Sequence, residues 1–320
     1  MTELSERLER LEEAITAACR KAGRNRSEVE LMAVSKTNPA ATIAEAASLG
    51  LRLFGENRVQ EFAAKAPELA TLAQAASEGR VSGHDFSRAE SPIESTWAPH
   101  ASKKLVPAET REGLVSGHDF SRAESPIESS WALAPEANSS GNPPALSQFF
   151  RACSNPIRVH LIGHLQTNKA ARAAELFDAV DSVDSVRLAE KLNEAAGRVR
   201  KRLPVLIEVK LSPEETKAGL EPESPEASAL LERLPNLDHL TTQGLMTIAP
   251  WGVAEEVTRA CFRSLREWRE RWAATHPRLA LDVLSMGMSG DFGLAIEEGA
   301  TRIRIGTALF GKRQPWAGAE

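Results

Sequence analysis

Short apolar segments alternate with longer amphipathic segments along most of the chain. Most of the apolar segments end in small or polar residues and lead into a helical pattern. There are eight of them, at residues 31–36, 51–56, 159–165, 177–182, 205–211, 240–248, 281–287 and 301–306. Strands that alternate with helices form parallel βαβ units. Eight such units predict an α/β fold, a single (β/α)8 barrel of the TIM type, with an open doubly wound sheet as the alternative.

An amphipathic segment precedes the first apolar run. Leu4, Leu8, Leu11 and Ile15 recur at spacings of three and four residues, which places them on one face of a helix. The pattern predicts a helix over residues 3–22 that ends near Gly23 and packs this face on the rest of the fold.

One long stretch, residues 73–150, departs from the pattern. It is rich in Pro, Gly and Ser and poor in Leu, Ile, Val and Phe, so burial cannot offset the entropy of ordering it. Within it, residues 81–98 return at 115–132 with a single change, which indicates a recent duplication. We expect a disordered or loosely attached insertion in a single domain spanning 1–320. It falls between the helix after the second strand and the third strand, on the face opposite the catalytic loops of a barrel.

Charge and composition argue against several classes of partner. The formal net charge is -5, and Lys and Arg are scattered along the chain, so we expect no basic face for nucleic acid. No apolar run approaches the roughly 20 residues that cross a bilayer. Cys19, Cys153 and Cys261 are far apart and lack CxxC spacing, which argues against disulfides and thiolate metal sites. We therefore expect a cytoplasmic protein with no metal and no membrane contact.

Lys36 is the first candidate for chemistry, because it ends the first apolar segment and precedes a helical segment that begins at Pro39. A lysine at the end of a buried strand can point its amine into the mouth of a barrel. Partial desolvation there lowers the pKa of the amine and makes it a nucleophile toward aldehydes. The alternative is a lysine that closes the strand and extends into water.

Two glycine-containing turns follow the last two predicted strands. The seventh strand leads into residues 287–291, which include Ser289, and the eighth leads into Gly306 and Thr307. Loops at these positions of a (β/α)8 barrel commonly bind phosphate through backbone N–H groups and hydroxyls. The chain contains neither GxxxxGK[ST] nor GxGxxG. The phosphate therefore belongs to a small cofactor or substrate rather than to a nucleotide.

A phosphate site combined with a strand-end lysine suggests pyridoxal 5′-phosphate (PLP), which carries an aldehyde and a phosphate on one ring. Arg304 lies two residues before Gly306, on the same side of the eighth strand, where it can face the pyridine nitrogen. A guanidinium cannot accept a proton, so it would keep that nitrogen unprotonated. The alternative for Arg304 is an ion pair with a carboxylate at the strand end.

Six motifs together resemble those of a known family, the pyridoxal phosphate homeostasis proteins. They are AVSKT at 33–37, FGENRVQE at 54–61, HLIGHLQTNK at 160–169, GLM at 244–246, LSMGMS at 284–289 and RIGTALFG at 304–311. The resemblance covers essentially all of the chain outside 73–150. It implies a single barrel similar to the N-terminal domain of alanine racemase.

The resemblance also implies a cofactor site. PLP would form a Schiff base with Lys36, its phosphate would lie near Ser289, Gly306 and Thr307, and Arg304 would lie by the ring nitrogen. The complete set of implied cofactor-binding residues is Lys36, Asn57, Met246, Ser289, Arg304, Gly306 and Thr307. Members of this family are described as carriers or regulators in PLP homeostasis without an established reaction. PLP-dependent apoenzymes are the implied recipients of the cofactor.

Three positions depart from the usual motifs of this family. Val159 replaces a common Trp, Leu161 a common Phe, and Lys210 a common Asn. Lys210 can bring a second amine toward the mouth of the barrel.

Two enzymatic alternatives stand beside the carrier hypothesis. One is a PLP-dependent amino-acid racemase or decarboxylase, with Lys210, His160 or His164 as a base. Racemisation of the alanine racemase type needs a tyrosine and a second domain, and this chain has no tyrosine. The other is a Schiff-base aldolase that acts on a sugar phosphate. No long heptad pattern or extra interface domain occurs, so we expect a monomer.

Overall fold

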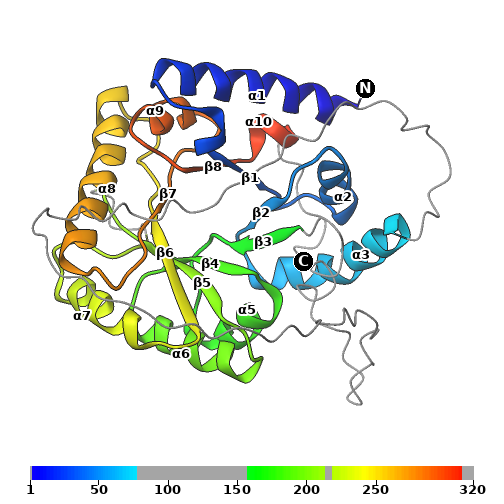
Figure 1. Cartoon of the computed structure of the whole chain (residues 1–320). Helices are drawn as coiled ribbons and strands as arrows, with labels where there is room; N and C mark the ends of the chain where they lie inside the picture. The colour runs from blue at the N-terminus through cyan, green and yellow to red at the C-terminus, as the bar shows by residue number, and fades with distance from the viewer. Residues whose placement is uncertain (1, 78–156, 213–217, 312–320) are drawn as a thin grey trace, which may run out of the picture. The chain divides into compact units, whose positions relative to one another are not determined.

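Eight parallel strands form a closed barrel in the computed structural model, which describes residues 2–77, 157–212 and 218–311 (Figure 1). The strands are β1 (Glu30–Val34), β2 (Leu53–Glu56), β3 (Arg158–Leu161), β4 (Ala179–Val183), β5 (Leu203–Glu208), β6 (Leu240–Met246), β7 (Val283–Ser285) and β8 (Arg302–Ile305). Each strand pairs with the next along the chain, and β1 pairs with β8. The barrel prediction is confirmed, and the open sheet is excluded.

Helices surround the barrel, and most of them connect successive strands (Figure 1). They are α1 (Glu3–Lys21), α2 (Ala40–Ser48), α3 (Val59–Ser77), α5 (Ala170–Leu176), α6 (Val186–Arg198), α7 (Pro225–Arg233), α8 (Glu255–Thr275), α9 (Phe292–Glu297) and α10 (Thr307–Phe310). None of these described helices has the length and apolar composition that spanning a bilayer requires.

The predicted N-terminal helix is α1, which contacts α9 and α10 (Figure 1). Thr2 caps it by accepting a hydrogen bond from the Ser5 amide, and Gly23 follows its end at a φ of 66°. Leu4, Leu11 and Ile15 are buried. As predicted, one apolar face attaches this helix to the outer helical layer.

The predicted strand limits extend beyond the observed ones at several ends. The clearest example is β1, which ends at Val34, so Lys36 lies in the loop that follows. The expected insertion at 73–150, with its duplicated segments, lies outside the described residues except for 73–77, which belong to α3.

Charged side chains fill the inside of the barrel near the first residues of several strands. Arg302 Nε donates to Glu30 Oε2 at 2.9 Å, and its Nη1 donates to Asp181 Oδ2 at 3.2 Å. His160 Nδ1 lies 3.0 Å from Asp181 Oδ1. Burial alone would raise the pKa of Asp181, but His160 and Arg302 hold it below its ordinary value. Asp181, His160 and Arg302 satisfy one another where water is excluded, and Glu30, with a side chain 30% exposed, lies at the edge of this cluster.

Apolar side chains lie along the strands in two separate groups besides the main core. One contains Met32, Val34, Leu53 and Ile162, and the other contains Leu206, Met246 and Val283. Side chains of a strand alternate between its two faces, so a barrel has one apolar layer inside and another under its helices. Val34 and Met246, the last residues of β1 and β6, belong to these groups, so the apolar side chains reach up to the loops that follow the strands.

We expect Arg302→Gln to destabilise the barrel by about 3–5 kcal/mol, because it leaves Asp181 and Glu30 without their shared cation. Urea unfolding monitored by tryptophan fluorescence measures the change. The matched control is Arg172→Gln, which removes a surface ion pair to Glu175 and should cost about 1 kcal/mol or less. Equal losses in the two variants would contradict the structural role of the buried charges.

Candidate functional site at the carboxyl ends of the strands

Lys36 lies in a tight turn between β1 and α2. The Asn38 amide donates to the Ser35 carbonyl at 3.0 Å, so Lys36 and Thr37 are the two central residues of the turn. The Lys36 carbonyl accepts hydrogen bonds from Thr37 Oγ1 at 2.6 Å and Asn38 Nδ2 at 3.2 Å. Lys36 is half-buried, at the end of the barrel where active sites of this fold lie.

The two predicted phosphate turns lie next to each other. Ser289 Oγ accepts a hydrogen bond from the Ala308 amide at 3.2 Å, which joins the turn after β7 to the segment after β8. A methyl group added to Gly306 would lie 3.6 Å from the Val34 carbonyl oxygen. The turns therefore adjoin the end of β1, two residues before Lys36. Of the seven predicted residues, Lys36, Ser289, Gly306 and Thr307 lie on adjoining loops.

Gly287 is required for the shape of the turn after β7. Its φ of 91° favours glycine, and an added Cβ would lie 2.5 Å from Ala295 Cβ in α9. Asp291 Oδ1 closes the turn by accepting the Met288 amide at 2.5 Å. Because Ser289 Oγ accepts a backbone hydrogen bond, its own proton is available for an oxygen ligand.

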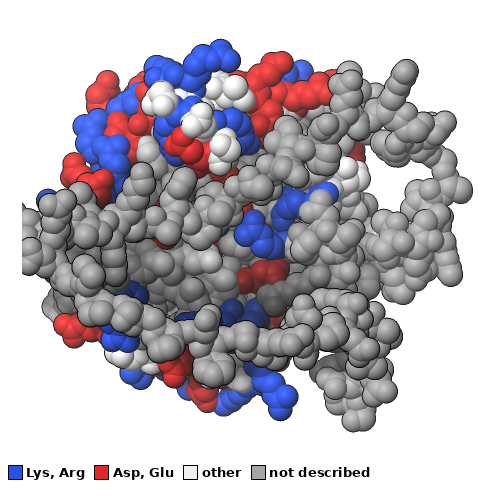
Figure 2. Space-filling model, viewed as in Figure 1, with Lys and Arg blue, Asp and Glu red and all other residues white. Residues whose placement is uncertain are grey.

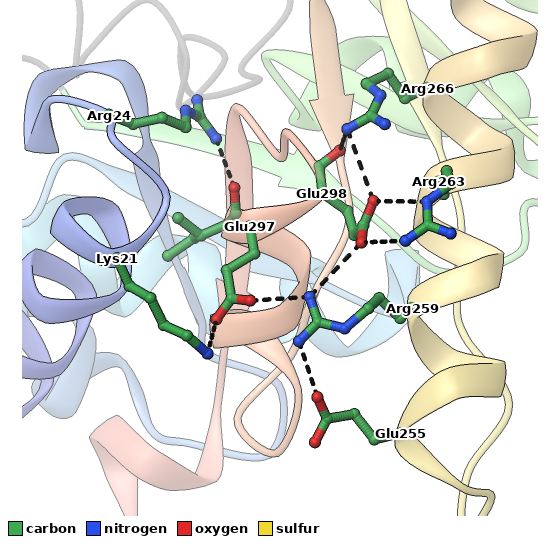
Figure 3. A network of polar contacts seen from close by, with 9 residues as sticks. Lys21, Arg24, Glu255, Arg259, Arg263, Arg266, Glu297 and Glu298 are labelled. Carbon is green, nitrogen blue, oxygen red and sulfur yellow. Dashed lines mark hydrogen bonds and ion pairs between the residues drawn. The ribbon is translucent and has the colours of Figure 1, made fainter.

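The helix that follows this turn, α9, is fixed at its carboxyl end by cations from α1, α8 and the loop after α1 (Figure 3). Arg24 Nη1 donates to the Ile296 carbonyl at 3.0 Å, where the helix dipole favours a positive charge. Arg259 contacts Glu297 at 2.9 Å, and Arg263 contacts Glu298 at 2.9 Å. This network holds the helix whose first turn adjoins Ser289. Figure 2 shows Lys and Arg side chains mixed with Asp and Glu side chains around α1, at the top of the molecule.

Arg304 is buried inside the barrel and held by uncharged acceptors. Its Nη1 donates to the Ser285 carbonyl at 2.6 Å and to Ser285 Oγ at 2.9 Å, and its Nη2 donates to the Thr247 carbonyl at 2.8 Å. Burial lowers the pKa of the guanidinium, while Asp181 and Glu208 oppose that change. Contacts with β7 and the end of β6 thus fix the direction of this cation.

Asn57 and Met246 occupy different environments. Asn57 is half-buried after β2, and its carbonyl oxygen would lie 2.3 Å from a Cβ added to Gly163. Met246 is fully buried with Leu206 and Val283. Met246 belongs to the inner apolar layer below the loops, whereas the Asn57 backbone packs against the loop after β3.

Lys210 lies two residues after β5, at the carboxyl end of the barrel, and its side chain is 16% exposed. Its Nζ lies 3.9 Å from Glu221 Oε1, and the Glu221 side chain is 73% exposed. The amine is therefore directed toward a carboxylate at the surface.

Glu208 is a candidate residue that the sequence reasoning missed. It is the last residue of β5 and only 4% exposed, and its Oε2 has no hydrogen-bond partner among the described residues. Burial raises the pKa of the carboxyl from 4.5 to about 7, Asp184 adds to the rise, and Arg304 opposes it. The available sequence signal was a charged residue at the end of the apolar run Val205–Ile207.

Comparison with known proteins identifies the class to which this barrel belongs. The family model of the alanine racemase N-terminal domain matches residues 7–314. The pyridoxal phosphate homeostasis protein of Aquifex aeolicus is 32% identical over 97% of this chain and 98% of its own length. That of Vibrio cholerae is 32% identical over 98% of both chains. The chain belongs to the alanine racemase N-terminal domain family and, within it, to the pyridoxal phosphate homeostasis proteins.

A solved structure supports the same grouping. PipY of Synechococcus elongatus PCC7942, solved with PLP bound, is 32% identical to this chain. The match covers 97% of this chain and 100% of PipY, with a TM-score of 0.63. The predicted resemblance is thereby confirmed at the level of family and fold.

We expect Glu208→Gln to change the pH dependence of stability. Between pH 4.5 and about 7 the native carboxyl keeps a proton that the unfolded chain has released, so wild-type stability falls as the pH rises through this range. The gap between the two pKa values corresponds to about 3 kcal/mol at about 1.4 kcal/mol per pKa unit. The stability of the variant should not fall over this pH range, so the variant should be more stable than wild type at pH 8.

Urea unfolding at a series of pH values tests this, with exposed Glu232→Gln as the matched control. A profile of Glu208→Gln parallel to that of wild type would show that Glu208 is ionised throughout.

Proposed function

We propose that the chain binds PLP through a Schiff base on Lys36 and acts in PLP homeostasis as a carrier or regulator, without robust catalysis. The observation that carries this proposal is the meeting of the Lys36 turn with the two glycine turns at one end of the barrel. A lysine that bonds the aldehyde and a site that binds the phosphate must be neighbours, because PLP carries both groups on one small ring. The names of the relatives and the PLP-bound structure of PipY support this cofactor.

The residues present suit PLP chemically. Ser289 retains a hydroxyl proton for a phosphate oxygen, and Gly306 and Thr307 adjoin it on the next loop. Arg304 is a fixed, buried cation suited to a pyridine nitrogen without a proton. When bound, PLP supplies a reactive aldehyde and an electron-withdrawing ring. A ring nitrogen beside a guanidinium withdraws electrons weakly, which favours holding the cofactor over catalysis.

PLP-dependent racemisation or decarboxylation is the second candidate, because Glu208 is a buried carboxyl able to carry a proton near neutral pH. The absence of tyrosine from the sequence argues against the two-base racemisation of alanine racemase. Sustained conversion of alanine or serine that disappears in Lys36→Ala would favour the enzyme. We infer a cytoplasmic monomer that passes PLP to PLP-dependent apoenzymes.

Borohydride reduction of the PLP-loaded protein should leave a phosphopyridoxyl adduct on Lys36, because reduction makes the covalent link permanent. Peptide mass spectrometry identifies the lysine. Lys36→Ala should lose the adduct, while Lys210→Ala should keep it on Lys36. An adduct on Lys210 in wild type, or one that survives in Lys36→Ala, would overturn the assignment. Colourless protein that gains no absorption on adding PLP would leave the sugar-phosphate aldolase as the better hypothesis.

Ser289→Ala should weaken PLP binding about tenfold, because it removes one hydrogen bond to a charged phosphate. The same variant should bind pyridoxal, which lacks the phosphate, as well as wild type does. Absorption titration with both ligands measures the difference. Equal weakening of the two ligands would show that Ser289 does not contact the phosphate.

A further inference from the structure

Thr37, the residue after Lys36, has a backbone conformation that its side chain disfavours. Its φ is 65°, and positive φ is a genuine outlier for a β-branched residue. It is the third residue of the Ser35–Asn38 turn, a position where positive φ normally selects Gly or Asn. Strained residues of this kind persist only where surrounding contacts impose the geometry.

A carboxylate from α3 supplies one such contact. Glu61 Oε1 accepts the Thr37 amide at 2.5 Å, and the Glu61 side chain is 9% exposed. Glu61 Oε1 also lies 2.8 Å from the ammonium of Lys65, one helical turn further along. The hydrogen bond to a buried charged acceptor fixes the direction of the Thr37 amide.

The same ammonium reaches the other side of Lys36. Lys65 Nζ donates to the Ser35 carbonyl at 3.2 Å and to Glu56 Oε1 at 3.1 Å. Ser35 Oγ donates to Glu56 Oε1 at 2.8 Å, and Ser35 and Glu56 are fully buried. Contacts from β2 and α3 therefore hold the residues on both sides of Lys36, Ser35 before it and Thr37 after it.

We propose that Glu61 and Lys65 are positioning residues for Lys36, an inference that rests on the proposed PLP function. They impose the turn that sets the direction of the Lys36 side chain, and so they determine how well its amine meets an aldehyde. Neither side chain needs to touch the cofactor, because both act through the backbone of Ser35 and Thr37. The contacts of Glu61 and Lys65 offset the cost of the strained Thr37 conformation, and this conformation gives Lys36 a defined direction.

A pair of ligands isolates this role. PLP can form a covalent bond with Lys36, whereas pyridoxine 5′-phosphate carries the same phosphate and an alcohol in place of the aldehyde. Glu61→Met keeps the length of the side chain but removes the strong acceptor. It should weaken PLP binding about tenfold, equivalent to about 1.4 kcal/mol, and leave pyridoxine 5′-phosphate binding unchanged. Glu61→Gln keeps an acceptor oxygen and should stay within about threefold of wild type for PLP.

A second substitution tests the backbone mechanism directly. Glycine adopts positive φ readily, so Thr37→Gly should recover part of the lost PLP affinity when combined with Glu61→Met. If the Glu61→Met single variant does not fold, the double variant is compared with Thr37→Gly instead. Adding Glu61→Met to Thr37→Gly should then weaken PLP binding by less than tenfold, because glycine already adopts positive φ. Glu68→Ala, an exposed change on the same helix, should alter neither ligand.

Titration of PLP-free protein, followed by absorption for PLP and by calorimetry for pyridoxine 5′-phosphate, provides the measurement. The positioning role would be overturned if Glu61→Met weakened the binding of both ligands equally or left the affinity for PLP unchanged. It would also be overturned if the double variant bound PLP no more tightly than Glu61→Met. The proposed function fails separately, if Lys36→Ala weakens the binding of PLP no more than that of pyridoxine 5′-phosphate.

Discussion

The parallel pairing of β1 with β8 is the constraint on which the site depends. These strands are the first and last of the barrel, and their register places Glu30 beside Arg302 and Met32 beside Arg304. The same register brings the end of β1 next to Gly306. Segments about 270 residues apart in the sequence thereby form one site, with a charged pair below it and a loop from each strand above it.

The inside of the barrel is organised by how its charges are satisfied. Arg302 is held by two carboxylates, whereas Arg304 is held by carbonyls and a hydroxyl. The hydrogen bonds of Arg304 go to carbonyls and a hydroxyl, so the carboxylates of Asp181, Glu208 and Asp291 oppose its charge from beyond hydrogen-bond contact. Glu208 lies on the nearby β5 and is held partly protonated by burial. The upper layer thus presents a fixed cation together with a carboxyl that can gain or lose a proton.

The sequence was sufficient for the barrel and for the loops that carry the site. Most strands were visible because they are buried on both faces and therefore read as short apolar runs, although β8 alternates Arg with Ile. The Gly287 and Gly306 turns were visible because both follow the last two predicted strands, where a barrel of this kind commonly binds phosphate. Glu208 and the contacts of Lys65 were missed, because a charged residue in an apolar or helical pattern gives no sign of burial. The pairing of Thr37 with Glu61 depends on how α3 packs beside β1, which periodicity does not encode.

The location of strain in this barrel bears on what the site does. Binding a small molecule noncovalently needs only complementary groups, and the turns at 287–291 and 306–307 are the proposed source of those groups, with a glycine at positive φ in the first turn. A covalent bond also requires an amine aimed along a defined direction. The β-branched Thr37 at positive φ, with a buried ion network behind it, lies beside Lys36, the lysine that we propose forms this bond. The strain is therefore best understood as part of the presentation of Lys36.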